Sequence, residues 1–289
     1  GKTAFALNLA RNAAVDNNMP VAIFSLEMSS IELVNRLMTT ESGLESEKIK
    51  GAQELTQKDW DQLQYSVKAL AKSPIYIDDT PGLSVMEFRT KAKRLVKSKG
   101  VRFIIVDYLQ LMQGPSELRD MREQEVAAIS RTLKGTAKEL EIPIMALSQL
   151  SRNAVQRGNS NNRPMLSDLR ESGSIEQDAD IVMFVHRPDA IGLGETVEDK
   201  EYTEIIFAKN RNGQIGTIAM RYKGGQLKFV EANDNLAATF GSAMNGPVTG
   251  GDSGSQGFDG GYNPADDFGG GMPSGGFPGP GEFDNSSFM

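Results

Sequence analysis

The chain has 289 residues, a formal charge of −7 and no cysteine. The lack of cysteine excludes disulfides and cysteine-ligated zinc and fits a reducing, cytoplasmic setting. No apolar run reaches the roughly 18 residues of a membrane span, so we expect no membrane partner. Six acids and no bases follow Gly241, so the rest of the chain is near neutral, which argues against a general basic coat for nucleic acid but permits a local basic groove.

Short apolar runs alternate with helical periodicity along the first part of the chain, which is typical of an α/β fold with a mostly parallel sheet flanked by helices. The last three strands lie close together and are expected to be antiparallel. The expected strands are 20–26, 75–77, 102–106, 142–147, 180–185, 202–208, 216–221 and 227–230. The expected helices are 3–16, 30–41, 57–72, 85–98 and 121–140. Ser84 and Glu87 have the spacing of a capping box at the start of the fourth helix.

Two segments lack any such pattern. Residues 237–289 hold half of the 30 glycines and no Lys or Arg, so they cannot bury enough apolar surface to fold. We expect a disordered, Gly-rich acidic tail there and one folded domain over 1–236. The stretch 148–170 has no apolar periodicity either, and a loop of that length inside a domain is usually functional.

The chain opens on Gly1-Lys2-Thr3, which matches the end of a G-x-x-x-x-G-K-[ST] phosphate-binding loop. In such a loop the Lys reaches the β- and γ-phosphates and the hydroxyl ligates Mg²⁺. By itself the triplet is weak, because any lysine-bearing surface could contain it. On the nucleotide interpretation the first half of the loop is missing, and we expect the chain as given to bind ATP poorly and to be inactive as a motor.

Three polar residues end apolar strands. Asp107 follows the run 103–106, Glu27 follows 21–26, and Gln149 follows 142–147. Ligands bind at the carboxyl ends of strands in open α/β sheets, where an acid can hold Mg²⁺ and a second carboxylate can orient the attacking water. The alternatives are an Asp that caps a strand, a Glu that stabilises a helix start, and a solvated Gln.

Four segments resemble one family, the motor domain of the bacterial replicative DNA helicase, or DnaB family. They are FSLEMS at 24–29, VDYLQLM at 106–112, LSQLSR at 147–152 and LSDLRESGSIEQDAD at 166–180. The resemblance runs in order over about 1–232. The last segment is the most specific, because simple nucleotide binding would not require it.

The resemblance implies a RecA-like P-loop NTPase fold, with ATP and Mg²⁺ as cofactors and a role for each matching residue. Gly1, Lys2 and Thr3 bind the phosphates, and Thr3 and Asp107 hold Mg²⁺, partly through water. Glu27 is then the hydrolytic base, Gln149 the γ-phosphate sensor, and Arg36 a nucleotide contact. The alternative for Arg36 is that it lies on a solvent-facing side of its helix, as an Arg in a helix usually does.

Lys209 and Arg211 match the element that acts on the neighbouring subunit's ATP. Positions two apart on a strand point to the same face, so both cations can meet one triphosphate. An arginine supplied in this way is worth about 10³–10⁵ in rate. The alternative is a basic surface hairpin.

DNA contact is expected from the long loop and the segment that follows it. Arg152, Arg157 and Arg163 stand in 148–164 without acids or aromatics, which favours sequence-independent, salt-sensitive binding to the backbone. The resemblance adds Arg170, Glu171 and Gly173, with Gly173 allowing close backbone approach.

The expected function is a homohexameric, ATP-hydrolysing helicase that moves 5′→3′ on single-stranded DNA during replication, with primase and a helicase loader as partners. The alternatives are another RecA-like oligomeric ATPase, such as a recombinase, and a non-catalytic DNA-binding module. Segment 169–177 argues against the first alternative. A measurement of ATP hydrolysis would distinguish the second alternative from an enzyme. The lone His186 and Trp60 are expected to be structural.

Overall fold

The fold is given by a computed structural model that describes residues 1–118, 120–150, 163–189 and 200–232. These residues all belong to one compact unit. The expected acidic tail from 237 onward and residues 151–162 of the long loop lie outside the described residues. Within the described ranges, no helix is long and apolar enough to cross a membrane.

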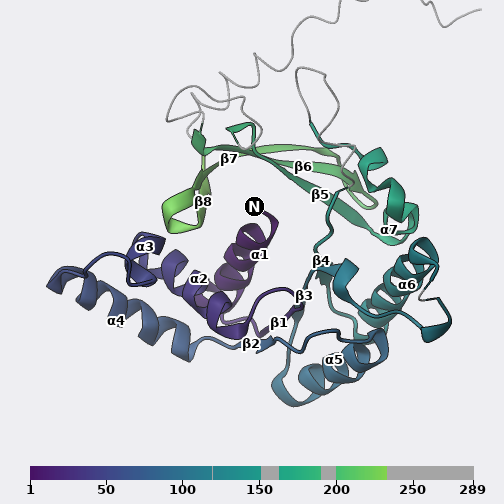
Figure 1. The fold of residues 1–289 in the computed structure, drawn as a ribbon, viewed down its shortest axis with the longest axis horizontal. Coiled ribbons are helices and arrows are strands. Elements are labelled where there is room, and N and C mark those ends of the chain that lie inside the picture. Colours follow the sequence, from purple (N-terminus) through teal and green to yellow (C-terminus); the bar gives the residue numbers. More distant parts are fainter. Residues whose placement is uncertain (119, 151–162, 190–199, 233–289) are drawn as a thin grey trace, which may run out of the picture. The chain divides into compact units, whose positions relative to one another are not determined.

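Four parallel strands form the first sheet, in the order β2-β1-β3-β4 (Figure 1). They are β1 (Val21–Ser25), β2 (Ile75–Asp78), β3 (Phe103–Asp107) and β4 (Ile144–Ala146). The central strands β1 and β3 are almost completely buried, as in a parallel sheet covered on both faces. Successive side chains point to opposite faces, so Phe24 and Ile104 enter one core and Ile23 and Ile105 the other. The expected parallel sheet is confirmed.

Helices cover both faces of this sheet. The α-helices of the described residues are α1 (Lys2–Arg11), α2 (Ser30–Ser42), α3 (Ser46–Ile49), α4 (Gln57–Lys72), α5 (Val85–Lys99), α6 (Arg122–Leu140) and α7 (Gly173–Asp178), and α1, α2, α5 and α6 supply most of the covering residues. Leu7 of α1 and Leu33 of α2 fill one core. Phe88 of α5 and Ile129 of α6 fill the other, where the Phe88 ring meets that of Phe24 edge-on at 4.9 Å. Figure 1 shows α5 and α6 together, away from α1 and α2.

Local signals explain most helix boundaries. Three helices begin with a capping box, formed by Ser29 with Glu32, Thr56 with Asp59, and Ser84 with Glu87. The third confirms the expectation at Ser84. The helix expected over 3–16 is α1 followed by a π-helical turn, Asn12–Asp16. The helices α3 and α7 have four and six residues, which is too short for a periodic pattern to reveal them.

A second sheet is antiparallel, in the order β5-β6-β7-β8. Its strands are β5 (Ile181–His186), β6 (Tyr202–Asn210), β7 (Gly216–Lys223) and β8 (Lys228–Glu231). The antiparallel order of the last three was expected, but β5 also pairs antiparallel with β6 instead of extending the parallel sheet. An apolar run of this length suits either kind of sheet, so its pattern alone does not decide between them.

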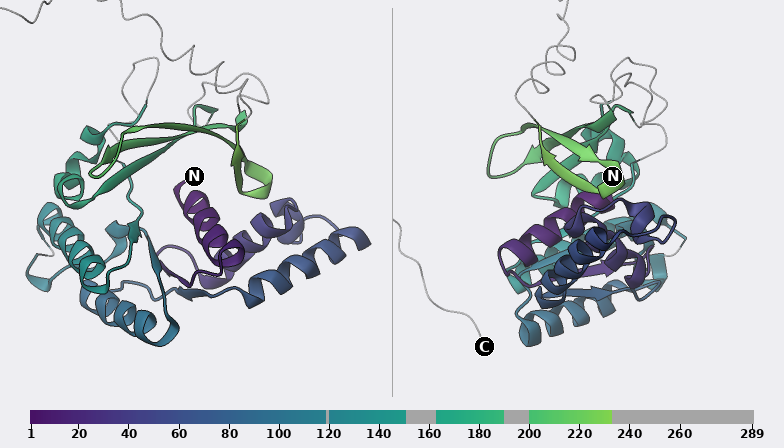
Figure 2. Two further views of the ribbon diagram at one scale, coloured as in Figure 1. Left: turned by 180° about the vertical axis from the view of Figure 1, so that it is seen from behind. Right: turned by 90° about the vertical axis from the view of Figure 1, so that its left-hand side faces the viewer.

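The second sheet covers the start of α1 (Figures 1 and 2). Ala4 and Phe5 pack with Ile205, Tyr222 and Phe229. The side-chain amide of Asn8 donates to the carbonyl of Leu227 at 2.8 Å and its oxygen accepts from the amide of residue 229 at 3.1 Å. The helix that begins at Lys2 is therefore held between the two sheets.

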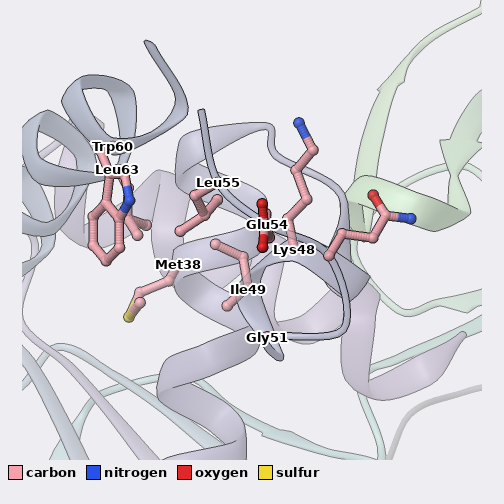
Figure 3. Close-up of a pocket in the computed structure, with 9 residues that line it drawn as sticks. Met38, Lys48, Ile49, Gly51, Glu54, Leu55, Trp60 and Leu63 are labelled. Atoms are coloured by element: carbon pink, nitrogen blue, oxygen red, sulfur yellow. The ribbon is translucent and has the colours of Figure 1, made fainter. Parts of the chain in front are cut away.

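An apolar pocket of about 520 Å³ opens between α2, α3 and α4 (Figure 3). Its lining includes Met38, Ile49, Leu55, Trp60 and Leu63. Trp60 was expected to be a packing residue, and its side chain does line this pocket while remaining half-exposed.

Candidate nucleotide site

The carboxyl ends of β1 and β3 bring Glu27 and Asp107 to one edge of the parallel sheet. Ser25 and Asp107 are register partners, and the amide of Leu26 donates to the carbonyl of Asp107 at 2.7 Å. The hydroxyl of buried Ser25 donates to the carbonyl of Met28 at 2.6 Å and accepts from its amide at 3.2 Å. This tight turn presents Glu27, whose side chain is exposed.

The carboxyl group of Asp107 is the centre of the site. It is 3% exposed, and its Oδ2 has no hydrogen-bond partner among the described residues. Burial raises its pKa above the ordinary value, and the negative charge of Glu27 adds to the increase. The Thr3 hydroxyl and then the cations of Lys2 and Arg36 act in the opposite direction. Thr3, Glu27, Lys2 and Arg36, all expected in a nucleotide site, are therefore close enough to Asp107 to influence its pKa.

The same atoms fit a magnesium ion. Mg²⁺ in phosphoryl-transfer sites takes one or two protein oxygens and completes its shell with phosphate and water. The unpartnered Oδ2 of Asp107 and the nearby hydroxyl of Thr3 are oxygens of this kind. The described residues contain no cluster of three or more acidic, His or Cys ligands that could hold a metal without a phosphate.

Gln149 lies at the same sheet edge. Beyond the end of β4, the amide of Leu147 donates to Val106 and the amide of Leu109 donates to Leu147, both at 2.9 Å. The side chain of Gln110 then bonds to the hydroxyl of Ser148 at 2.7 Å and to the amide of Gln149 at 3.3 Å. The Gln149 side chain is left exposed, free to reach a ligand at this edge.

Lys209 and Arg211 lie elsewhere, at the end of β6. The Lys209 ammonium and the Arg211 Nη2 both donate to the carbonyl of Gln177, at 3.3 Å each. Arg211 also pairs with Asp180 at 3.2 Å, and its side chain is 52% exposed. The side-chain partners of the two cations lie in α7 and in the residues just before β5, and none of these partners is Asp107. The structure thus separates the two predicted halves of the site within one chain.

The predicted DNA contacts have different outcomes. Arg152 and Arg157 lie outside the described residues, and the side chains of Arg170 and Glu171, in the 3-10 helix Leu166–Ser172, are likewise not described. Gly173 begins α7 with φ −53, and a β-carbon added there would meet nothing within 4 Å. The fold itself therefore does not require glycine at this position, which leaves room for a ligand to approach.

Arg163 is engaged inside its own chain. Its Nε and Nη2 each donate to a carboxylate oxygen of buried Glu204 at 3.0 Å, and Nη2 also reaches Thr217 at 3.2 Å. This bidentate pair anchors the end of the long loop to β6. Arg163 was expected to contact DNA, and this ion pair was not expected, because nothing near Arg163 in the chain indicates a carboxylate 41 residues away.

Sequence reasoning missed Arg187 and Tyr222. The Arg187 guanidinium lies 4.6 Å from the Tyr222 ring centroid, and Nη2 donates to Asp189 at 2.7 Å. A β-carbon added to Gly1 would lie 3.5 Å from the δ-carbon of Arg187, so this cation stands beside the phosphate-loop triplet. Only the pairing of β5 with the rest of the sheet brings it there. The expected structural role of His186 fits its burial in β5.

Comparison with known proteins places this geometry in a family. Residues 1–231 match the DnaB-like helicase C terminal domain. The chain is similar to the replicative DNA helicase DnaC of Bacillus subtilis (strain 168), 49% identical over 230 residues that make up 80% of this chain and 50% of that protein. It is also 47% identical over 244 residues to the replicative DNA helicase DnaB of Geobacillus stearothermophilus, covering 84% and 52% of the two chains. The chain thus spans about half the length of these relatives.

Solved structures agree with these matches. A DnaB-like replicative helicase, described together with its interactions with primase, superposes with a TM-score of 0.75 at 39% identity, over 81% of this chain and 55% of that one. A second solved structure, of an ATPase domain, gives a TM-score of 0.74 at 40% identity, over 81% of each chain. The RecA-like fold and the resemblance found in the sequence are both confirmed, and the chain belongs to the family of DnaB-like helicase C-terminal domains.

Proposed function

We propose that this chain is the ATP-hydrolysing motor domain of a replicative DNA helicase that moves 5′→3′ on single-stranded DNA. The observation that carries the proposal is the buried Asp107 carboxyl group, with Oδ2 unpartnered among the described residues, at the edge where β1 and β3 end. Lys2, Thr3, Glu27 and Arg36 all influence its pKa. The named relatives are replicative DNA helicases, which supports the proposal that ATP hydrolysis drives DNA unwinding.

Each residue of this cluster has a chemical role. Lys2 and Arg36 supply positive charge to the phosphates, where a cation neutralises charge that develops on the transferred group. Thr3 and Asp107 would hold Mg²⁺, which when bound offsets negative charge on the β- and γ-phosphates. Exposed Glu27, which follows β1 at the same sheet edge as Asp107, would accept a proton from the attacking water. Gln149 offers a neutral amide to the γ-phosphate.

Arg211 and Lys209 support an assembly of several copies. In the described structure their partners are in α7 and at Asp180, not in the Asp107 cluster, and Arg211 is half-exposed. We assign them to the nucleotide of an adjacent subunit, in a homohexameric ring whose ATP sites lie between subunits. The ring would work in the cytoplasm. Its primase partner is proposed from the structural relative described with primase, and a helicase loader from the family resemblance.

Single-stranded DNA would bind through the backbone contacts of Arg152, Arg157 and Arg170, with Glu171 in the same segment and Gly173 admitting a phosphate closely. Arg163 acts in this proposal by anchoring the loop through Glu204. Because the contacts are made to phosphates, binding should weaken steeply as salt increases.

The test compares Lys2→Ala and Asp107→Asn with Arg221→Ala in the assembled protein, which here means a ring whose subunits carry the complete phosphate-binding loop. Arg221 of β7 pairs with Glu201, the residue before β6, and serves as the matched control. We expect ATP hydrolysis stimulated by single-stranded DNA to fall about 100-fold or more in the first two variants, as when one charge-stabilising group is lost, and to persist in the control. The unmodified protein should unwind forks with a 5′ tail. Unwinding that needs only a 3′ tail, or hydrolysis that survives Asp107→Asn, would contradict the proposal.

A further inference from the structure

Asp180 lies where α7, α6 and the end of β6 meet. It directly precedes β5, whose first described pair with β6 joins Ile181 to Asn210. Asp180 and Arg211 are therefore the next opposed residues of the same ladder, and the amide of Arg211 donates to the carbonyl of Asp180 at 2.8 Å. Residues opposed in this way have neighbouring side chains.

The Arg211 guanidinium is held at two points. Its Nη1 pairs with Oδ1 of Asp180 at 3.2 Å, and its Nη2 donates to the carbonyl of Gln177 at 3.3 Å. The other carboxylate oxygen of Asp180, Oδ2, pairs with the ammonium of Lys134 on α6. Lys134, Arg211 and Lys209 are the cations around Asp180, and they lower the pKa of its carboxyl group, Lys134 contributing most. Asp180 therefore stays ionised at neutral pH.

The Lys134 contact connects this arrangement to the subunit's own sheet. The neighbouring residue Leu133 is buried in the core that contains Val106 of β3, the residue before Asp107. α6 is thus fixed relative to the strand that ends at the nucleotide site. Through Lys134 and Asp180, the position of the Arg211 guanidinium is defined with respect to that helix.

We propose that Asp180 is a positioning residue for hydrolysis in the adjacent subunit: it orients the Arg211 guanidinium before the neighbouring nucleotide is engaged. This rests on the proposed function, in which Arg211 acts on that nucleotide. A long exposed side chain otherwise samples many rotamers, and a charge-stabilising donor is effective when it needs no reorganisation during the reaction. Arg211 and Asp180 are 52% and 49% exposed, and exposed pairs add little to folding stability. Loss of Asp180 should therefore change the orientation of the Arg211 guanidinium and leave the stability of the fold nearly unchanged.

The experiment replaces Asp180 with Asn in the assembled protein. We expect kcat for ATP hydrolysis stimulated by single-stranded DNA to fall about 10- to 100-fold, the scale of a displacement of about 1 Å in a reacting group, with the KM for ATP nearly unchanged. The matched control is Glu139→Gln. Glu139 is an exposed carboxylate on α6 that pairs with Arg89 and Lys93, and its loss should leave kcat unchanged.

A double-mutant cycle separates positioning from a general structural effect. In an Arg211→Ala background, Asp180→Asn should cause no further loss, because the group that it positions is absent. An equal additional loss in that background would overturn the inference, and so would an unchanged or increased kcat in Asp180→Asn alone. If Arg211→Ala itself hydrolyses ATP normally, the proposed function of Arg211 fails and the inference fails with it. Loss in Arg211→Ala with normal Asp180→Asn overturns the inference only.

Discussion

Replacing Arg163 with Ala tests whether this residue holds the fold or contacts DNA. The Glu204 carboxylate that it binds is only 5% exposed, whereas the Arg163 side chain is 33% exposed. The variant leaves a buried carboxylate with the hydroxyl of Tyr202 at 3.2 Å. Removing one partner of a fully buried pair costs about 3–5 kcal/mol, and an exposed pair is worth about 0–1 kcal/mol. With one partner partly exposed, we expect a loss of about 2–3 kcal/mol in the free energy of unfolding.

Thermal unfolding measures this loss, which corresponds to a fall in Tm of about 5–10 °C for a domain of this size. Arg221→Ala is the control, because Arg221 of β7 pairs with Glu201, just before β6, and both side chains are partly exposed, at 29% and 26%. The Tm of this variant should fall by no more than about 2–4 °C. A Tm for Arg163→Ala within about 2 °C of the unmodified protein, together with a weaker salt dependence of DNA binding, would refute the reasoning and make Arg163 a DNA contact.

Three further variants follow from the structure. Burial raises the pKa of Asp107, so the fold loses stability as pH rises from the ordinary carboxyl pKa through this raised one. Asp107→Asn should lower ATP hydrolysis about 100-fold or more and yet raise the Tm of the nucleotide-free protein at neutral pH. Burial lowers the pKa of His186 below 6.5, so the unfolded chain takes the proton first and stability falls as pH drops below about 6.5. His186→Gln should flatten Tm plotted against pH between about 7 and 5.5. Arg187→Ala, which removes a cation beside Gly1, should weaken binding of a fluorescent ATP analogue about tenfold, the worth of one charged hydrogen bond; unchanged affinity would exclude Arg187 from the site.

The nucleotide edge could be predicted because it depends on a general property of parallel sheets. Strands that run the same way end at the same edge, so Asp107 and Glu27, each after an apolar run, were expected together, and the Ser25–Asp107 register places them so. Their catalytic roles remain predictions. The family resemblance added Arg36, whose positive charge acts to lower the pKa of Asp107.

The contacts that the sequence did not reveal join residues far apart in the chain. An arginine in a polar loop has the same local pattern whether it faces solvent or, like Arg163, a buried carboxylate. Arg187 and Tyr222 meet only because β5 joins the antiparallel sheet, an arrangement that apolar periodicity cannot distinguish from an added parallel strand. The contacts of Asp180 with Lys134 and Arg211 likewise arise from packing.

The central claim, that Arg211 completes the site of an adjacent subunit, is tested most directly by mixing two inactive variants. Arg211→Ala rings keep Glu27 and lack the arginine, whereas Glu27→Gln rings keep the arginine and lack the base. In mixed rings, some interfaces join an intact Glu27 to an intact Arg211 of the neighbour. We predict that ATP hydrolysis in these rings exceeds that of either variant alone. Activity that never rises above the average of the two, at any mixing ratio, would contradict the claim.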